Sequence, residues 1–227
     1  MFMKTNIILI HISIIIVIAF LGVQVNASEE SIKVSNITSS QYNVSWISHQ
    51  PCVGRVVLIE NNQNNIIFYD DDGTDLEGTL HYITVNGLKA NTTYSFLVQS
   101  GENVYNNQGQ NFQVTTGPNL MPVGTIQPAG RVLLHDGSPA VNAIVHITIN
   151  GDNGLSSLLS TRVDGNGFWY IELINAREAD HQRLYQISSN DSLIISVNGA
   201  GNESAHYEGK IFDNEGGKNL YPDLLID

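Results

Sequence analysis

The sequence predicts an all-β fold made of two tandem β-sandwiches, and three observations predict it. Beyond its apolar start, the chain consists of short runs of alternating apolar and polar residues with turn signals between them, and helical periodicity is almost absent. The stretch from Ile83 to Val98 alternates, turns at Asn86-Gly87 and alternates again, which places Tyr94 where a tyrosine corner joins two strands of a sandwich. The same kind of pattern starts again after a stretch rich in proline.

The first element, residues 1–27, is predicted to be a signal peptide. Lys4 gives it a positive start, Ile7–Val23 forms an apolar run, and Val25-Asn26-Ala27 supplies a cleavage site before Ser28. The run is slightly shorter than the roughly 20 apolar residues that span a bilayer. Cleavage predicts a secreted or extracytoplasmic protein, in the periplasm or at the cell surface, with no stable membrane span. The alternative is a chain that stays anchored in a membrane by its N-terminus.

Residues 28–117 are predicted to form the first sandwich, because their alternating runs are closely spaced and bounded by turn residues. Residues 118–129 contain prolines and no alternation, which is typical of a short, rather stiff linker. The strands expected in the first sandwich are Ile32–Ile37, Tyr42–Ile47, Gly54–Glu60, Asn65–Tyr69, Thr79–Val85, Thr92–Ser100 and Gln110–Thr116.

Residues 130–212 are predicted to form the second sandwich, with a looser region at Asn175–Gln186 that has room for one helical turn. Residues 213–227 are polar and glycine-rich, and we expect a C-terminal tail that packs only through Leu220, Tyr221 and Leu224–Ile226. The strands expected in the second sandwich are Gly130–His135, Ala143–Ile149, Leu158–Val163, Phe168–Leu173, Ser192–Val197 and His206–Phe212.

The first half resembles a fibronectin type III domain. The resemblance rests on Trp46 in the second strand, on Leu88 with Tyr94 at the corner, and on the closing strand Phe112–Thr116. It is most similar to the variant that precedes purple-acid-phosphatase-like catalytic domains, in which a histidine opens the strand before the corner, as His81 does here. The ligand blocks that such a catalytic domain needs are absent from this sequence, so the resemblance implies a binding module without that chemistry.

The second half resembles a carboxypeptidase regulatory-like domain, which is a transthyretin-like sandwich. The similar segments are Gly130-Arg131-Val132, Asp136–Val141, Ala143-Ile144-Val145 and the turn Asp164-Gly165-Asn166-Gly167 before Phe168. Domains of this kind accompany extracellular enzymes and surface proteins and do no chemistry themselves. The resemblance therefore implies an accessory role.

Composition narrows the possible partners. The formal net charge is −12 with only 10 Lys and Arg residues, which argues against nucleic acid and anionic membranes because both require basic patches. Cys52 is the single cysteine, so no disulfide forms within the chain. It is expected either to be a half-buried apolar residue at the start of a strand or to pair with a partner chain.

The sequence predicts no catalytic residue, no metal site and no cofactor. The acidic run Asp70–Asp75 is expected to be a solvated turn, with calcium as the alternative, although its spacing fails an EF-hand. The histidines are scattered without the short spacing of a zinc site. His146 alternates with Val145 and Ile147, so we expect it on the solvent side of its strand.

The candidate ligand-binding residues are Phe168, Trp169 and Tyr170. Phe168 and Tyr170 share one face of a strand and Trp169 the other, so one face belongs to the core and the other presents aromatic surface on which a sugar can stack. The alternative is that Trp169 is core while Phe168 and Tyr170 cover an edge or the domain junction. The sequence thus predicts a non-catalytic exported binding, adhesion or spacer protein with an extracellular protein or carbohydrate as partner. The alternative is an accessory protein that positions a separate extracellular hydrolase on polysaccharide.

Overall fold

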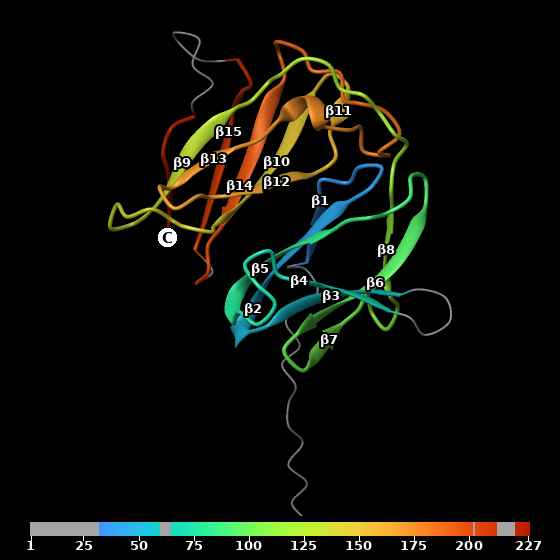
Figure 1. Ribbon diagram of the computed structural model, residues 1–227. Coiled ribbons are helices and arrows are strands. Elements are labelled where there is room, and N and C mark those ends of the chain that lie inside the picture. Colours follow the sequence, from blue (N-terminus) through green and yellow to red (C-terminus); the bar gives the residue numbers. More distant parts are fainter. Residues whose placement is uncertain (1–31, 60–64, 202, 213–220) are drawn as a thin grey trace, which may run out of the picture.

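The structure is a computed structural model that describes residues 32–59, 65–201, 203–212 and 221–227. The predicted signal peptide and Leu220 lie outside the described residues. Figure 1 shows two β-sandwiches, one built from the first half of the chain and one from the second. The predicted all-β fold of tandem β-sandwiches is confirmed.

The first sandwich consists of two facing sheets whose strands alternate between core and surface. One sheet has the order β1-β2-β5, and the facing sheet has the order β4-β3-β6-β7 with β8 also paired to β6. All of these pairings are antiparallel. The strands are β1 Lys33–Ser35, β2 Tyr42–Cys52, β3 Gly54–Ile59, β4 Ile66–Tyr69, β5 Gly78–Val85, β6 Thr93–Ser100, β7 Asn103–Tyr105 and β8 Phe112–Thr115.

The two aromatic residues that the sequence singled out hold this sandwich together. Trp46 is 3% exposed, and its indole Nε1 donates a hydrogen bond of 2.7 Å to Ser100 Oγ in the opposite sheet. The backbone N–H of Lys89 donates to the Tyr94 hydroxyl at 2.8 Å, which is the tyrosine-corner contact. The predicted tyrosine corner is therefore confirmed, and Trp46 is a core residue.

The sequence missed the end of strand β2. The register against β5 passes from Ile47 opposite Leu80 to Cys52 opposite Gly78, so the residues between them form a bulge. A bulge inserts unpaired residues and bends its strand, which the alternation of side chains does not reveal. This bulge carries Ser48 and Cys52 toward the buried His81.

The second sandwich also consists of two sheets. One has the order β11-β10-β14-β15 with β12 beside β10, and the other has the order β13-β9-β16. The 3₁₀ turn η2, Leu173–Asn175, ends where the looser region Asn175–Gln186 begins, so the helical turn lies before that region and not within it. The strands are β9 Ala129–Leu134, β10 Ile144–Gly151, β11 Gly154–Leu155, β12 Leu159–Arg162, β13 Phe168–Tyr170, β14 Ser192–Asn198, β15 Ser204–Lys210 and β16 Leu224–Ile226.

The C-terminal residues complete the second core. Strand β16 pairs in parallel with β9, with Leu224 opposite Val132. Leu224, Ile226 and Tyr221 are buried, and the Tyr221 hydroxyl donates to the Lys210 carbonyl at 3.0 Å. Of the residues that the sequence indicated, Tyr221, Leu224 and Ile226 pack on the second core, whereas Leu225 is exposed; Leu224–Ile226 forms a strand, which the sequence did not predict.

The two sandwiches meet through polar faces of their sheets. On β2 and β5, Ser45 and Tyr82 point away from the first core, yet they are 1% and 8% exposed. On β10 and β12, His146 and Ser160 point away from the second core and are 3% and 4% exposed. Ser45 Oγ lies 3.0 Å from His146 Nε2. The prediction that His146 faces solvent is wrong, because the first sandwich covers its side of the sheet.

Ion pairs and single hydrogen bonds extend this junction. The Arg162 guanidinium donates to both carboxylate oxygens of Asp72 at 2.6 Å. Lys33 Nζ donates to Asn198 Oδ1 at 3.2 Å, and the Arg177 guanidinium donates to the Pro118 carbonyl at 3.0 Å. Pro118, the first residue of the predicted linker, is therefore hydrogen-bonded to the second sandwich.

Candidate functional site

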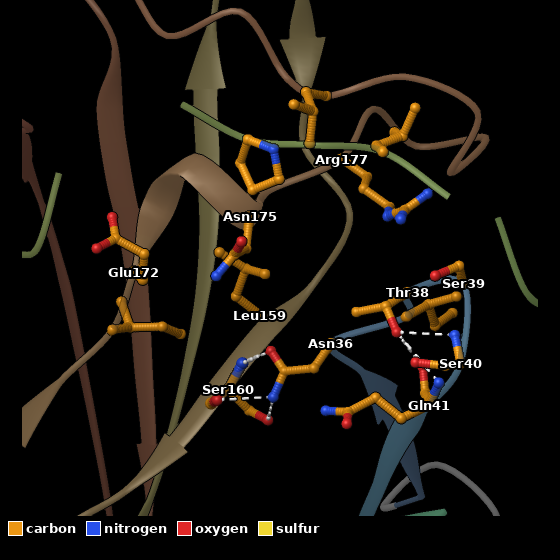
Figure 2. Close-up of a pocket in the computed structure, with 15 residues that line it drawn as sticks. Asn36, Thr38, Ser39, Ser40, Gln41, Leu159, Ser160, Glu172, Asn175 and Arg177 are labelled. Atoms are coloured by element: carbon orange, nitrogen blue, oxygen red, sulfur yellow. Dashed lines mark hydrogen bonds between the residues drawn. The ribbon is translucent and has the colours of Figure 1, made fainter. Parts of the chain in front are cut away.

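A polar cavity of about 460 Å³ lies at the junction of the two sandwiches. The loop of residues 36–41, which joins β1 to β2, forms one wall. The other wall comes from the start of β12 and from residues 171–177 around η2, and Leu120 and Pro122 of the connecting segment complete it. Figure 2 shows the polar side chains of the two walls on either side of the opening.

Asn36 fixes the first wall to the second sandwich. Its side-chain Nδ2 donates to the Ser160 carbonyl at 2.8 Å, and its Oδ1 accepts from the Ser160 backbone N–H at 2.9 Å (Figure 2). The same Nδ2 lies 3.0 Å from Asn43 Oδ1 and 3.2 Å from the Tyr82 hydroxyl. The backbone of Asn36 has φ +51°, a left-handed conformation that Asn tolerates better than most residues. Asn36 thus pairs with the edge of β12 as a further strand would.

Tyr82 supports this contact from β5. Its hydroxyl lies 2.9 Å from Ser160 Oγ, and Ser35 Oγ lies 2.7 Å from the same oxygen. Burial raises the pKa of Tyr82 to about 12, so the hydroxyl keeps its proton as a hydrogen-bond donor. Five polar side chains, those of Ser35, Asn36, Asn43, Tyr82 and Ser160, therefore share one network, which sets the relative position of the two walls.

The loop after Asn36 is shaped by Thr38. Its hydroxyl donates to the Gln41 carbonyl at 3.2 Å and accepts from the backbone N–H groups of Ser40 and Gln41 at 3.2 and 3.1 Å (Figure 2). These hydrogen bonds satisfy the Thr38 hydroxyl and the backbone groups that it contacts, so these groups are not available to a ligand. The side chains of Ser39 and Gln41 make no hydrogen bond to any residue that the structure describes, so they are available to a ligand.

The second wall holds one acidic and one basic side chain. The Glu172 carboxylate accepts from the Ile126 backbone N–H at 2.8 Å and from Thr125 Oγ1 at 3.0 Å. The Arg177 guanidinium is bonded to two carbonyls, those of Pro118 and His181, and within the described parts of the chain it has no carboxylate partner. Burial lowers the pKa of Arg177 from its usual value.

This arrangement is suited to binding. Its volume falls within the range of about 300–1,000 Å³ that is usual for small-molecule sites. Amide and hydroxyl groups on its walls, including the exposed amide of Asn175, lie above apolar side chains such as Leu159 and Ile171. A hydrogen-bonded base and nucleophile are not among the described residues that line it. We therefore treat the cavity as a candidate binding site for a neutral polar ligand.

The sequence did not indicate this cavity, because its residues come from two domains and belong to no motif. The residues that the sequence did propose, on β13, lie elsewhere. Trp169 is 1% exposed and belongs to the core, whereas Phe168 and Tyr170 are 43% and 65% exposed. The Arg131 guanidinium covers one side of the Phe168 ring, 5.3 Å from its centroid. Of the three, Phe168 and Tyr170 provide an accessible aromatic face, and its binding of a ligand stays a prediction.

The acidic run Asp70–Asp75 forms turns with exposed residues, as expected, except that its first residue is buried. Asp70 is 9% exposed and its Oδ2 lies 2.7 Å from His81 Nδ1. Asp71 accepts from the Thr84 backbone N–H and hydroxyl, at 2.9 and 2.7 Å. Asp72 pairs with Arg162 across the junction. Asp71, Asp72 and Asp75 are exposed, so only the first carboxylate of the run is buried within the fold.

The described residues lack two further kinds of feature. They contain no group of three or more His, Cys, Asp or Glu side chains placed to hold a metal ion. They also contain no helix with the length and apolar character required to cross a membrane.

Comparison with known proteins adds little to this picture. No protein-family model matches the chain, and no curated protein matches it. Among solved structures it is similar to the FN1–FN3 domains of chicken CNTN1, with 11% identity and a TM-score of 0.24. That alignment covers 86% of this chain, and this chain spans 64% of the other.

Proposed function

We propose that this chain is a non-catalytic, exported binding module in which the two sandwiches act as one unit and the cavity at their junction holds a hydroxyl-rich ligand such as a carbohydrate. A fibronectin type III-like sandwich is typically a binding or spacer domain. The single observation that carries the proposal is the bonding of Asn36 to both backbone groups of Ser160, because it fixes the two walls of the cavity relative to each other.

The chemistry of the walls supports this class of ligand. Hydroxyl groups of a sugar both donate and accept hydrogen bonds, and so do the amides of Gln41 and Asn175 and the hydroxyl of Ser39. The Glu172 carboxylate is an additional acceptor at the same opening. A preformed site loses little conformational entropy on binding, which favours affinity for a small ligand.

A glycan array probed with the purified protein, followed by calorimetric titration of the best ligand, tests this proposal. Replacing Gln41 and Asn175 together by Ala should weaken binding about tenfold or more, since two hydrogen bonds of about 0.5–1.5 kcal/mol each are lost. Gln110→Ala is the matched control, because Gln110 is an exposed amide far along the chain on the first sandwich. Equal affinities of the double variant and the control would rule out the cavity as the site.

A second candidate function is an accessory role, in which the protein holds a separate hydrolase on polysaccharide. The exposed Phe168 and Tyr170 favour it, because rings on one face of a strand can stack on a sugar chain. Tyr170→Ala should then abolish pull-down on insoluble polysaccharide and leave binding of short glycans in the cavity unchanged. Retention of Tyr170→Ala on the polysaccharide would exclude this role for β13.

A further inference from the structure

A second cluster shares no residue with the junction cavity. It brings together a nucleophile, a base and a carboxylate. Asp70 Oδ2 lies 2.7 Å from His81 Nδ1. On the other side of the imidazole ring, Nε2 lies 3.7 Å from Cys52 Sγ and 3.2 Å from Ser48 Oγ. Strand β5 supplies His81, the bulge of β2 supplies Ser48 and Cys52, and Asp70 follows β4 directly.

The fold fixes the orientation of the imidazole ring. Asp70 Oδ1 accepts from the Tyr82 backbone N–H at 2.9 Å, so its other oxygen faces the ring. His81 is fully buried and stacks on Trp46, with ring centroids 4.6 Å apart. A side chain at Gly54 would overlap both the His81 ring and the Asp70 carboxylate, so only glycine leaves room for the pair.

These contacts determine which nitrogen carries the proton. A carboxylate accepts hydrogen bonds, so His81 Nδ1 donates its proton to Asp70 and Nε2 presents its lone pair to Cys52 and Ser48. The Ser48 hydroxyl has only one proton, and the Gln50 carbonyl is its nearest acceptor at 2.8 Å. Nε2 is therefore left to accept the proton of the Cys52 thiol. A nucleophile beside a base that a third group orients is the arrangement that activates side chains for covalent chemistry.

Cys52 also opens onto a cavity, while His81 does not reach solvent. The cavity measures about 520 Å³ and lies between the bulge of β2 and the turn that joins β6 to β7. Polar groups line it, including Gln50 and Asn103. The other titratable groups that face it are His49, Glu102 and Tyr105. Burial, with a smaller effect of the adjacent Cys52, raises the pKa of Tyr105, which keeps that hydroxyl neutral.

We propose that Cys52 is a thiol–disulfide exchange site that takes a low-molecular-weight disulfide with polar substituents. The Cys52 thiol transfers its proton to His81 Nε2, and the thiolate attacks one sulfur of the disulfide. The S–S bond of the ligand breaks, a new bond forms between Cys52 and one half of it, and the other half leaves as a thiolate that takes the proton from His81. Cys52 is oxidised and the leaving half is reduced, so no further oxidant is needed, and excess thiol reverses the reaction. Asp70 is a positioning residue, because it acts through His81.

The test uses 2-hydroxyethyl disulfide, a polar probe without charge, so the net charge of −12 does not affect its approach. Intact-mass spectrometry follows the gain of one mercaptoethanol unit at neutral pH. The half-exposed Cys52 of the folded protein should react about tenfold faster than Cys52 of the protein unfolded in urea. The effect of urea itself is removed by measuring a free thiol under both conditions. Burial alone would slow the folded protein, so a folded rate equal to or below the unfolded rate would overturn the proposal.

Variants test the relay separately. Folded Asp70→Asn should exchange about tenfold or more slowly, whereas Asp75→Asn, at an exposed position of the same acidic run, should not change the rate. Simple loosening of the fold would expose Cys52 and speed the reaction, so a slower rate distinguishes positioning from a structural role. Should Asp70→Asn fail to fold, the comparison of folded and unfolded protein decides alone. An unchanged rate in folded Asp70→Asn, or a Cys52-linked dimer in place of the small adduct, would refute the proposal.

Discussion

Replacing Asn36 by Ala should separate the contribution of the domain junction from that of the two cores. The substitution removes the side-chain bonds to the Ser160 carbonyl and N–H, which are 2.8 and 2.9 Å long, and leaves both backbone groups of Ser160 without that partner. Each buried polar group that loses its partner costs about 1–3 kcal/mol. The left-handed backbone at φ +51° adds about 1–2 kcal/mol, because Ala tolerates this conformation poorly. We therefore expect Asn36→Ala to lower the free energy of unfolding by about 3–8 kcal/mol.

Asn91 provides a matched control for the backbone effect. It has φ +50°, is exposed, and its side chain makes no hydrogen bond to any described residue. Asn91→Ala should cost only the backbone penalty of about 1–2 kcal/mol. The difference between the two variants in urea melts isolates the hydrogen bonds across the junction. A loss in Asn36→Ala no larger than that in Asn91→Ala would refute the view that these bonds hold the sandwiches together.

Three further predictions concern other parts of the chain. Burial, and to a smaller extent Lys33, lower the pKa of His146 to about 3, so the unfolded chain binds this proton first as pH falls. The free energy of unfolding should therefore drop by about 1.4 kcal/mol per pH unit between about pH 6.5 and 3. In urea melts His146→Asn should lose that slope, and parallel slopes of the variant and the original protein would contradict this prediction. Trp46→Ala should cost roughly 3–5 kcal/mol in the same melts, and a loss below about 1 kcal/mol would mean that Trp46 is not a core residue. N-terminal sequencing of the exported protein should begin at Ser28, and a membrane-bound chain that keeps Met1 would favour the anchor instead.

The sequence predicted the interior of each sandwich well, because alternation records which side of a strand faces its own core. Val145, Ile147 and Ile149 are all fully buried, as the alternation of β10 indicates. Tyr94 was placed correctly because its spacing from the turn residues is set by the local geometry of a corner. Each of these inferences uses residues close together in the chain.

The candidate sites depend on contacts between residues far apart in the chain. Alternation correctly places His146 on the outer side of β10, but it carries no information on what covers that side. Ser45 lies 101 positions away from it and supplies the cover. The pairing of Asp70 with His81 and Cys52 escaped prediction for a similar reason, because a bulge in β2 brings Cys52 to the ring and no residue pattern marks that bulge.

The polarity of the junction explains how two sandwiches can be held at one orientation without a shared apolar core. Apolar surfaces slide over each other at little cost, since the free energy follows the area that is buried. A buried hydrogen bond requires a specific partner at a specific distance, and a shifted junction would leave the amide of Asn36 and the hydroxyls of Ser160 and Tyr82 without partners. The network therefore acts mainly by selecting one relative orientation of the two sandwiches. Its contribution to the free energy with which the sandwiches associate is smaller. The junction cavity and the buried His146 both lie at this junction, so the geometry of both depends on the orientation that Asn36 fixes.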